Sequence, residues 1–174
     1  MFIAEWLTQV FGVRFRLENP YLFQTKAQMC KIIVTKGGLD IAFQTETCDR
    51  KHRRPDAQQC GRCSSCILRR HAFAALHIHD QTPYVYGLSD WLYEPVPFEV
   101  IDNGNHIPAV LYQVRNLNEH LNTSNPWNSL ARQYETLAAD IVDRTSAYYG
   151  LSEQEMREGL LQLLSRYVHE WVSL

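Results

Sequence analysis

The sequence contains no long hydrophobic run. Apolar residues make up 45% of the 174 residues, but no stretch approaches the roughly 20 apolar residues that a bilayer-crossing helix needs. The opening residues Met1–Trp6 also lack a basic cluster ahead of an apolar segment, so they do not have the pattern of a secretory signal. We therefore expect one or two globular domains in the cytoplasm, with no membrane partner.

Lysine is absent from the second half of the chain. From Ala72 to the end, five arginines stand against thirteen acids. The basic charge lies instead between Cys48 and His71, where only two acids accompany Arg50, Lys51, Arg53, Arg54, Arg62, Arg69 and Arg70. This excess indicates either that the arginines neutralise a negative centre or that they contact the phosphate of a nucleotide or a nucleic acid.

Cysteine is sparse, but four of the five cysteines form one pattern. Cys60, Cys63 and Cys66 follow one another at the spacing C-x2-C-x2-C, and Cys48 precedes them by a loop long enough to return. Thiolates at this spacing are typical of a tetrahedral structural zinc site. We predict that Cys48, Cys60, Cys63 and Cys66 bind Zn²⁺ in a closed site with no open position for a catalytic water.

Other uses of these cysteines remain open. Disulfides belong to oxidising compartments, which the absence of a signal disfavours. An iron–sulfur cluster also uses four thiolates, but the last cysteine of the ferredoxin triplet normally precedes proline, whereas Ile67 follows here. His52 could replace one sulfur. The three histidines His71, His77 and His79 are expected at the surface or in packing, and Cys30 is expected to be a buried thiol.

Local signals in the first part predict helices and one short strand. An amphipathic pattern predicts a helix over residues 2–11, and alternation over Val13–Leu17 predicts a strand. Thr25 and Gln28 match a capping box in front of a second helix, and Gly37-Gly38 is expected to end it.

The cysteine loop is expected to lead directly into a helix over residues 64–76. Cys66 would then occupy the first turn, where the helix dipole favours a thiolate, while Ile67 and Phe73 face a core. The aromatic-rich stretch 82–101 is interpreted as an irregular connector that packs its rings against the body. An exposed aromatic surface is the alternative.

The last third carries three amphipathic patterns. They predict a helix over residues 107–121, a longer one from Asn125-Pro126 to Gly150, and a last one that begins with a capping box at Ser152. The apolar stripe of the middle helix comprises Leu130, Tyr134, Leu137, Ile141 and Tyr148. The fold class predicted is mainly α with an α+β remnant: a zinc loop leading into a helix within residues 1–100, then a three-helix bundle over residues 101–174. We expect the bundle to be structural, with docking to a partner subunit as the alternative.

The residues around the cysteines resemble a known family. Thr47-Cys48 and the run Cys60–Phe73 are similar to the zinc-binding segment of the 7-cyano-7-deazaguanine synthase (QueC-like) family, and Asn19-Pro20 and Thr25-Lys26 resemble the stretch before it. The resemblance covers about residues 14–85. The long spacing between the first two cysteines and the appended helices look closer to synthase-like (QatC-type) proteins of bacterial anti-phage defence cassettes.

The resemblance implies ATP-dependent ligase chemistry. In the family a carboxylic acid of a deazapurine or related compound is adenylated and then attacked by ammonia, and the pathway enzyme of queuosine biosynthesis dehydrates the product to a nitrile. A PP-loop nucleotide-binding domain, opened by Ser-Gly-Gly-x-Asp-Ser, binds the ATP. Here the similar string Lys36–Asp40 lacks the first serine and follows a helix pattern, so we interpret it as a helix end.

Two functional hypotheses follow from the sequence. The first hypothesis is that the chain is the zinc-bearing C-terminal portion of such a ligase, active with ATP only when joined to a nucleotide-binding domain or other subunits. The candidates for contacts to phosphate or carboxylate are then Lys26, Arg62, Arg69 and Arg70. The second hypothesis is a noncatalytic zinc module whose basic loop binds a protein or a nucleic acid.

Overall fold

The computed structural model describes residues 2–49, 58–87 and 106–173, and within these ranges the chain is mainly helical. The helices are α1 (Phe2–Phe11), α2 (Lys26–Thr35), α3 (Leu39–Gln44), α4 (Ser64–Ala75), α6 (Ile107–Leu121), α7 (Pro126–Gln133), α8 (Asp143–Tyr149) and α9 (Glu153–Val172), with a π-helical turn at Leu137–Val142 before α8. No helix in the described ranges is long and apolar enough to cross a bilayer.

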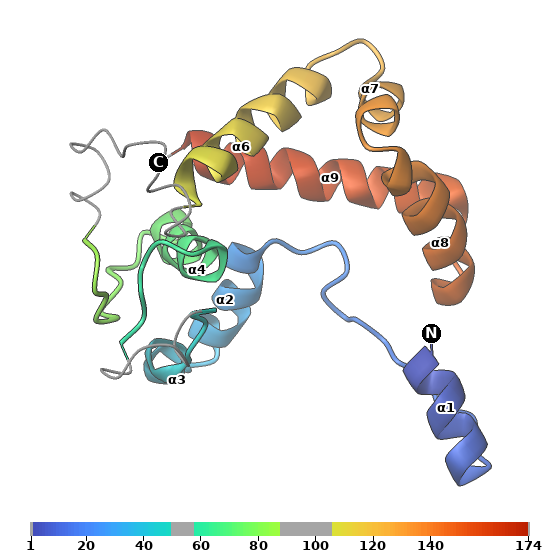
Figure 1. The fold of residues 1–174 in the computed structure, drawn as a ribbon, viewed down its shortest axis with the longest axis horizontal. Helices are drawn as coiled ribbons and strands as arrows, with labels where there is room; N and C mark the ends of the chain where they lie inside the picture. The colour runs from blue at the N-terminus through green and yellow to red at the C-terminus, as the bar shows by residue number, and fades with distance from the viewer. Residues whose placement is uncertain (1, 50–57, 88–105, 174) are drawn as a thin grey trace.

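Helix α9 is the longest element and organises the others (Figure 1). Helix α6 packs along it, and α7 and α8 cover the end at which α9 begins. Helices α2, α3 and α4 form a second group at its other end, where α4 contacts both α6 and α9. The predicted mainly helical fold is therefore confirmed, and the C-terminal helices pack around α9.

Two apolar clusters hold the C-terminal helices together. One joins α6, α7 and α9 through Val114, Leu117, Leu130 and Val168. The other joins the π turn to α9 through Val142, Met156 and Leu160, with Phe23 packed against it. Apolar burial at about 25 cal/mol per Å² is the main favourable term in such packing.

The predicted middle helix of the bundle is divided in two. Helix α7 ends at Gln133, and the hydroxyl of Tyr134 donates to Asn116 Oδ1 of α6 at 2.8 Å. The π turn that follows shifts the phase of the helix, so Val142 is fully buried while Ile141 is 39% exposed. The expected stripe is therefore wrong at Ile141, because a π turn adds a residue to the helical repeat.

The expected strand at Val13–Leu17 is also wrong, because these residues have no strand conformation. Their backbone forms no ladder with any described residue, and the one described bridge joins Gln59 to Tyr84. A strand requires a neighbour, and none of the described residues supplies one. Helix α3 was not predicted; it follows directly after the glycine pair.

The predicted helix ends are confirmed by their caps. Thr25 and Gln28 form a reciprocal capping box at α2, and Ser152 and Glu155 form another at α9. Gly37 lies beyond α2 with φ +76°, a left-handed conformation that favours glycine.

The first part of the chain is attached to the C-terminal helices by polar and aromatic contacts. The Thr25 hydroxyl donates to Glu170 at 2.6 Å, and Arg166 donates to Gln28 Oε1 at 2.6 Å. At the same end of α9, the Trp171 ring stacks on His71 of α4. These contacts join the portions before and after residue 100. A division into two domains at this residue stays a prediction.

Candidate metal centre

The four predicted ligands converge at the start of α4. Cys60–Cys63 forms a tight turn, and α4 begins at the next residue, so Cys66 lies in its first turn as expected. The Sγ atoms of Cys48, Cys60, Cys63 and Cys66 all lie within 4.8 Å of one another. The Sγ atoms of Cys60 and Cys66 are 3.9 Å apart, close to the edge of about 3.8 Å that a tetrahedron with Zn–S bonds of about 2.3 Å requires.

The sulfur cluster is buried and receives backbone hydrogen bonds. Cys60, Cys63 and Cys66 are almost fully buried. The Cys60 amide donates to Cys48 Sγ and the Cys63 amide donates to Cys60 Sγ, each at 3.3 Å. Such bonds stabilise thiolates, the form that binds metal.

Burial and these hydrogen bonds act in opposite directions on the thiol pKa values. Burial raises the pKa of Cys63 and of Cys66. At Cys60 burial also acts upward, but amide donors from Arg62 and Cys63 outweigh it and lower the pKa to about 7. A metal ion would favour the thiolate form at all four positions, because it supplies the positive charge that burial withholds.

Gly61 permits the tight turn between the first two sulfurs of the triplet. Its φ is +84°, and a Cβ atom there would lie 2.8 Å from the carbonyl oxygen of Tyr86 and 2.8 Å from the guanidinium of Arg70. Glycine is therefore required for both conformation and space.

A second segment, residues 82–87, packs against the outside of this turn and hydrogen-bonds to it. The amide of Val85 donates to Gln59 O at 3.0 Å, and the amide of Tyr86 donates to Cys60 O at 3.3 Å. The Tyr84 ring packs against the sulfur cluster. The interpretation of this stretch as a connector with inward-packed rings is thus confirmed for the residues described, while residues 88–101 lie outside them.

Arg62 and Arg70 stack on the two tyrosines of this segment, Tyr86 and Tyr84. The guanidinium carbon of Arg62 is 3.7 Å from the Tyr86 ring centroid, and that of Arg70 is 3.8 Å from the Tyr84 ring centroid. Arg70 also donates to Tyr86 O at 2.7 Å. The stacks hold two positive charges beside the sulfurs, at a distance at which cation–π attraction is effective.

Arg69 has a different environment. It is buried, and it donates to the hydroxyls of Thr82 at 3.0 Å and Thr45 at 2.7 Å. Its remaining nitrogen donates to the carbonyl oxygens of Ala42 at 2.7 Å and Phe43 at 3.2 Å. These bonds join α4 to the end of α3 and to residue 82. The side chain of Arg69 therefore points into the protein.

Two further predicted residues lie on α2. Lys26 is exposed at the first position of the helix. Cys30 is half-buried rather than fully buried, and this burial raises the pKa of its thiol. Cys30 does not belong to the sulfur cluster.

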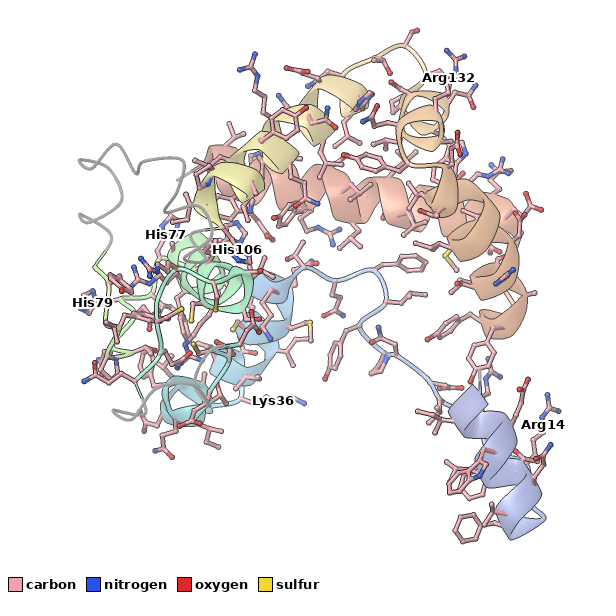
Figure 2. The ribbon with its side chains drawn as sticks, in the orientation of Figure 1. Arg14, Lys36, His77, His79, His106 and Arg132 are labelled. Carbon is pink, nitrogen blue, oxygen red and sulfur yellow. The ribbon has the colours of Figure 1, made fainter. Side chains whose placement is uncertain are left out.

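The histidines near the centre do not join the cluster of possible metal ligands found among the described residues. His71 is buried and stacks on Trp171 with a centroid distance of 4.2 Å. His77 and His79 are exposed, and Figure 2 shows both on the side of the molecule that carries α4. Their expected roles in packing and at the surface are thus confirmed. His52 and the basic residues 50–54 lie outside the described residues.

Sequence reasoning missed several residues that support the centre. Gln59 is buried, and its Oε1 accepts from the amide and the hydroxyl of Thr47. Asp49 accepts from Ser65 at 2.7 Å, and His106 pairs with Ser64 at 2.7 Å. Single polar residues have no periodicity, so only their proximity to the cysteine motif could have pointed to them.

The arrangement fits a structural metal ion. Four thiolates fill a tetrahedral shell and leave no position for a water or a substrate. The chemistry of the donor set favours a soft or borderline ion, and the fold brings Cys48 to the three sulfurs of Cys60–Cys66. The site therefore defines a helical protein with a buried cluster of four cysteines that are positioned to hold a metal ion.

Comparison with known proteins relates this centre to one family. Residues 4–77 match the family described as "Queuosine biosynthesis protein QueC". No solved structure matches the chain at a significant level. The segment that contains the four cysteines and α1–α4 is accordingly QueC-like.

Curated relatives agree with this match. The chain is 39% identical over 75 residues to a 7-cyano-7-deazaguanine synthase of Pseudomonas aeruginosa (strain LESB58). This alignment covers 43% of this chain and 32% of the relative. The chain is 36% identical over 73 residues to 7-cyano-7-deazaguanine synthase 1 of Sphingopyxis alaskensis, covering 42% and 31%. A synthase of Geobacter sulfurreducens is 36% identical over 77 residues, covering 42% and 30%. The chain thus spans about a third of the length of these relatives.

Proposed function

We propose that this chain is the zinc-binding C-terminal part of a 7-cyano-7-deazaguanine synthase-like, ATP-dependent ligase of an anti-phage defence system. It acts together with a PP-loop nucleotide-binding domain that adenylates a carboxylic acid. The observation that carries the proposal is the buried four-cysteine centre within a segment that matches the QueC family.

The metal in this proposal is zinc, and its role is structural. The four sulfurs are spaced for a tetrahedral ion, and the closed shell does not activate water. The ion fixes the turn Cys60–Cys63. This turn positions Tyr84 and Tyr86 and the arginines stacked on them.

The nucleotide-binding half is proposed to be a separate domain or a further part of the polypeptide. The one string that resembles its glycine-rich loop, Lys36–Asp40, spans the end of α2 and the start of α3. A phosphate loop instead follows a buried strand, where successive amides can surround the phosphate.

Within the proposal, Lys26, Arg62 and Arg70 contact the substrate acid or a phosphate group. The Nε of Arg62 is buried and has no hydrogen-bond partner among the described residues. Arg70 lines a hollow of about 340 Å³ with Ala74 and Ile78, a volume within the range of small-molecule sites. We assign Arg69 to the scaffold, because its donors are used inside the protein.

The defence assignment rests on the form of the chain. The helices after residue 106 pack around α9 and lie beyond the QueC-matched residues 4–77. Such an extension fits a ligase that modifies a larger substrate than a free deazapurine, because a helical layer offers additional surface for binding.

The test is reconstitution of adenylation. The purified chain is mixed with the protein of the same host that carries Ser-Gly-Gly-x-Asp-Ser, and ATP–pyrophosphate exchange is measured with a deazapurine carboxylic acid. Exchange that needs both components, and that falls when Arg62→Gln replaces the wild-type chain, supports the proposal. Exchange by the partner alone at the full rate would contradict it. Salt-sensitive binding of a generic oligonucleotide without any exchange would favour a noncatalytic zinc module instead.

A further inference from the structure

A polar hollow lies between the end of α6 and one face of α7. Its volume is about 520 Å³, and eight residues line it. Five of them recur at helical spacing along α7 and its N-cap: Asn125, Asn128, Ser129, Arg132 and Gln133. This spacing places them on one face of the helix, whereas Leu130 between them is fully buried in the core. Figure 2 shows Arg132 on α7, far from the metal-bearing helices α2–α4.

The lining carries positive charge and no negative charge. Arg132 is cationic, and none of the described residues that line the hollow is an acid. Acids are otherwise abundant in this part of the chain, where thirteen accompany five arginines from Ala72 onwards. A hard metal cation would require carboxylate oxygens, whereas an anion is repelled by them. The composition therefore points to an anionic ligand.

Arg132 is available to bind such a ligand. It is exposed, and its guanidinium makes no ion pair or hydrogen bond with any described residue. The forked donors of a guanidinium match the oxygens of a phosphate group, to which they bind in pairs.

A histidine on α6 is held in place beside this arginine-bearing face. His120 Nδ1 lies 2.8 Å from Ser129 Oγ, so this bond joins the end of α6 to α7. Because Nδ1 is engaged, Nε2 is the ring nitrogen left for a ligand. In the tautomer that carries its proton on Nε2, Ser129 donates to Nδ1 and Nε2 can donate to an anion.

The remaining side chains favour a ligand that carries hydroxyl groups. The side chains of Ser124, Asn128 and Gln133 bond to no other described residue. Amides and hydroxyls both donate and accept hydrogen bonds, as sugar hydroxyls do. No tyrosine, phenylalanine or tryptophan is among the described residues of the lining, so the hollow lacks the rings on which nucleic-acid bases usually stack. Its volume is within the range of small-molecule sites.

We propose that the hollow between α6 and α7 binds a phosphorylated sugar. Arg132 and His120 contact the phosphate group, and the amides of Asn128 and Gln133 bond to the sugar hydroxyls. The inference goes beyond the proposed function and does not depend on it, because α6 and α7 lie outside the QueC-matched residues 4–77.

The first test is titration calorimetry of the whole chain with ribose 5-phosphate, inorganic phosphate and ribose. We expect ribose 5-phosphate to bind about tenfold more tightly than inorganic phosphate, because the sugar adds hydrogen bonds. Ribose alone should give no measurable heat. Absence of ribose 5-phosphate binding at millimolar concentrations would overturn the inference. Tighter binding of adenosine monophosphate would also overturn it, because the lining offers no ring to hold a base.

The second test changes the charge of the hollow. Arg132→Gln should weaken binding of ribose 5-phosphate by about tenfold or more, because it removes a charged donor. Asn128→Asp should weaken it as well, because a carboxylate repels the phosphate group. An acid in the first turn of α7 is compatible with folding, since the helix dipole favours it there. The control is Arg115→Gln, which alters an exposed arginine of α6 outside the hollow and should bind as the wild type does.

Helical circular dichroism and metal content equal to wild type would show that the variants fold. Unchanged affinity in both Arg132→Gln and Asn128→Asp would place the ligand elsewhere and overturn the inference. Pyrophosphate exchange reports on the proposed function alone. Its failure leaves the assignment of the hollow in place, and failure of ribose 5-phosphate to bind leaves the ligase proposal in place.

Discussion

Three arginines from one short segment have separate roles at the residue scale. Arg62 and Arg70 lie on tyrosine rings beside the sulfur cluster, whereas Arg69 is buried and donates to four oxygens. Their neighbours explain the difference, because α3 and Thr82 present acceptors on only one side of α4. The sequence shows equal charges, and the partners distinguish them.

Replacing one ligand should remove the metal. Cys63→Ser is expected to lower the zinc content from about one per chain to near zero and to unfold the turn, since metal binding and folding are coupled in such sites. Zinc is measured by atomic emission after dialysis. The control is Cys30→Ser, which leaves the four-sulfur cluster intact. Equal metal in both variants would contradict the ligand assignment.

Arg69 should be intolerant of lysine. Arg69→Lys keeps the charge but not the forked donors, and it leaves buried oxygens unpaired. We expect a loss of roughly 2–3 kcal/mol in the free energy of unfolding, measured by denaturant titration. Arg14→Lys, at an exposed position, is the matched control. Stability within error of wild type would show that Arg69 is not part of the scaffold.

At the scale of elements, helix ends were more predictable than helix interiors. Both capping boxes and the glycine stop after α2 agree with the local sequence, because caps involve residues only three apart. The break between α7 and α8 was not visible, since it depends on Tyr134 bonding across to Asn116 of α6. Interactions between elements override propensity there.

The cap of α9 offers a quantitative test. Ser152→Ala removes the acceptor for the Glu155 amide at 3.2 Å and half of the capping box. We expect a loss of about 1 kcal/mol in the free energy of unfolding. Ser165→Ala, at an exposed position within the same helix, should change it little. A smaller loss for Ser152 than for Ser165 would show that the cap does not contribute.

At the scale of the whole molecule, α9 joins the metal-bearing part to the C-terminal helices. Its last turns contact α2 through Glu170 and α4 through Trp171, and its first turns pack on the π segment. A disturbance at this junction should therefore affect both parts, because α9 contacts both of them.

The buried histidine at this junction predicts a pH dependence. Burial against Trp171 and Tyr167 lowers the pKa of His71 to about 4. In the unfolded chain His71 takes up a proton near pH 6.5, whereas in the folded chain it does so only near pH 4. The stability that neutral, buried His71 contributes is therefore complete above pH 6.5 and is lost as the pH falls towards 4. The whole loss in the free energy of unfolding is about 3 kcal/mol.

The measurement compares His71→Phe with the wild type between pH 7 and 4.5. The variant should lose less free energy of unfolding over this range, while His79→Phe, at an exposed position, should follow the wild type. Glu170 and the metal ligands are present in all three proteins, so their titration is common to them. Identical slopes for His71→Phe and wild type would contradict the assignment.

The sequence by itself determined the four-cysteine centre, the helical class and most helix ends. Each of these depends on residues close in the chain: a spacing of two between cysteines, a period of 3.6, or a cap three residues long. The resemblance to the synthase family likewise came from short local motifs, chiefly the run Cys60–Phe73.

Only the tertiary structure decided the rest. It turned Arg69 inward, brought Tyr84 and Tyr86 over the arginines, divided the middle helix, and left Val13–Leu17 without a neighbouring strand. These features depend on atoms from segments distant in sequence. A local pattern states what a segment can form, whereas its partners in space decide whether it does.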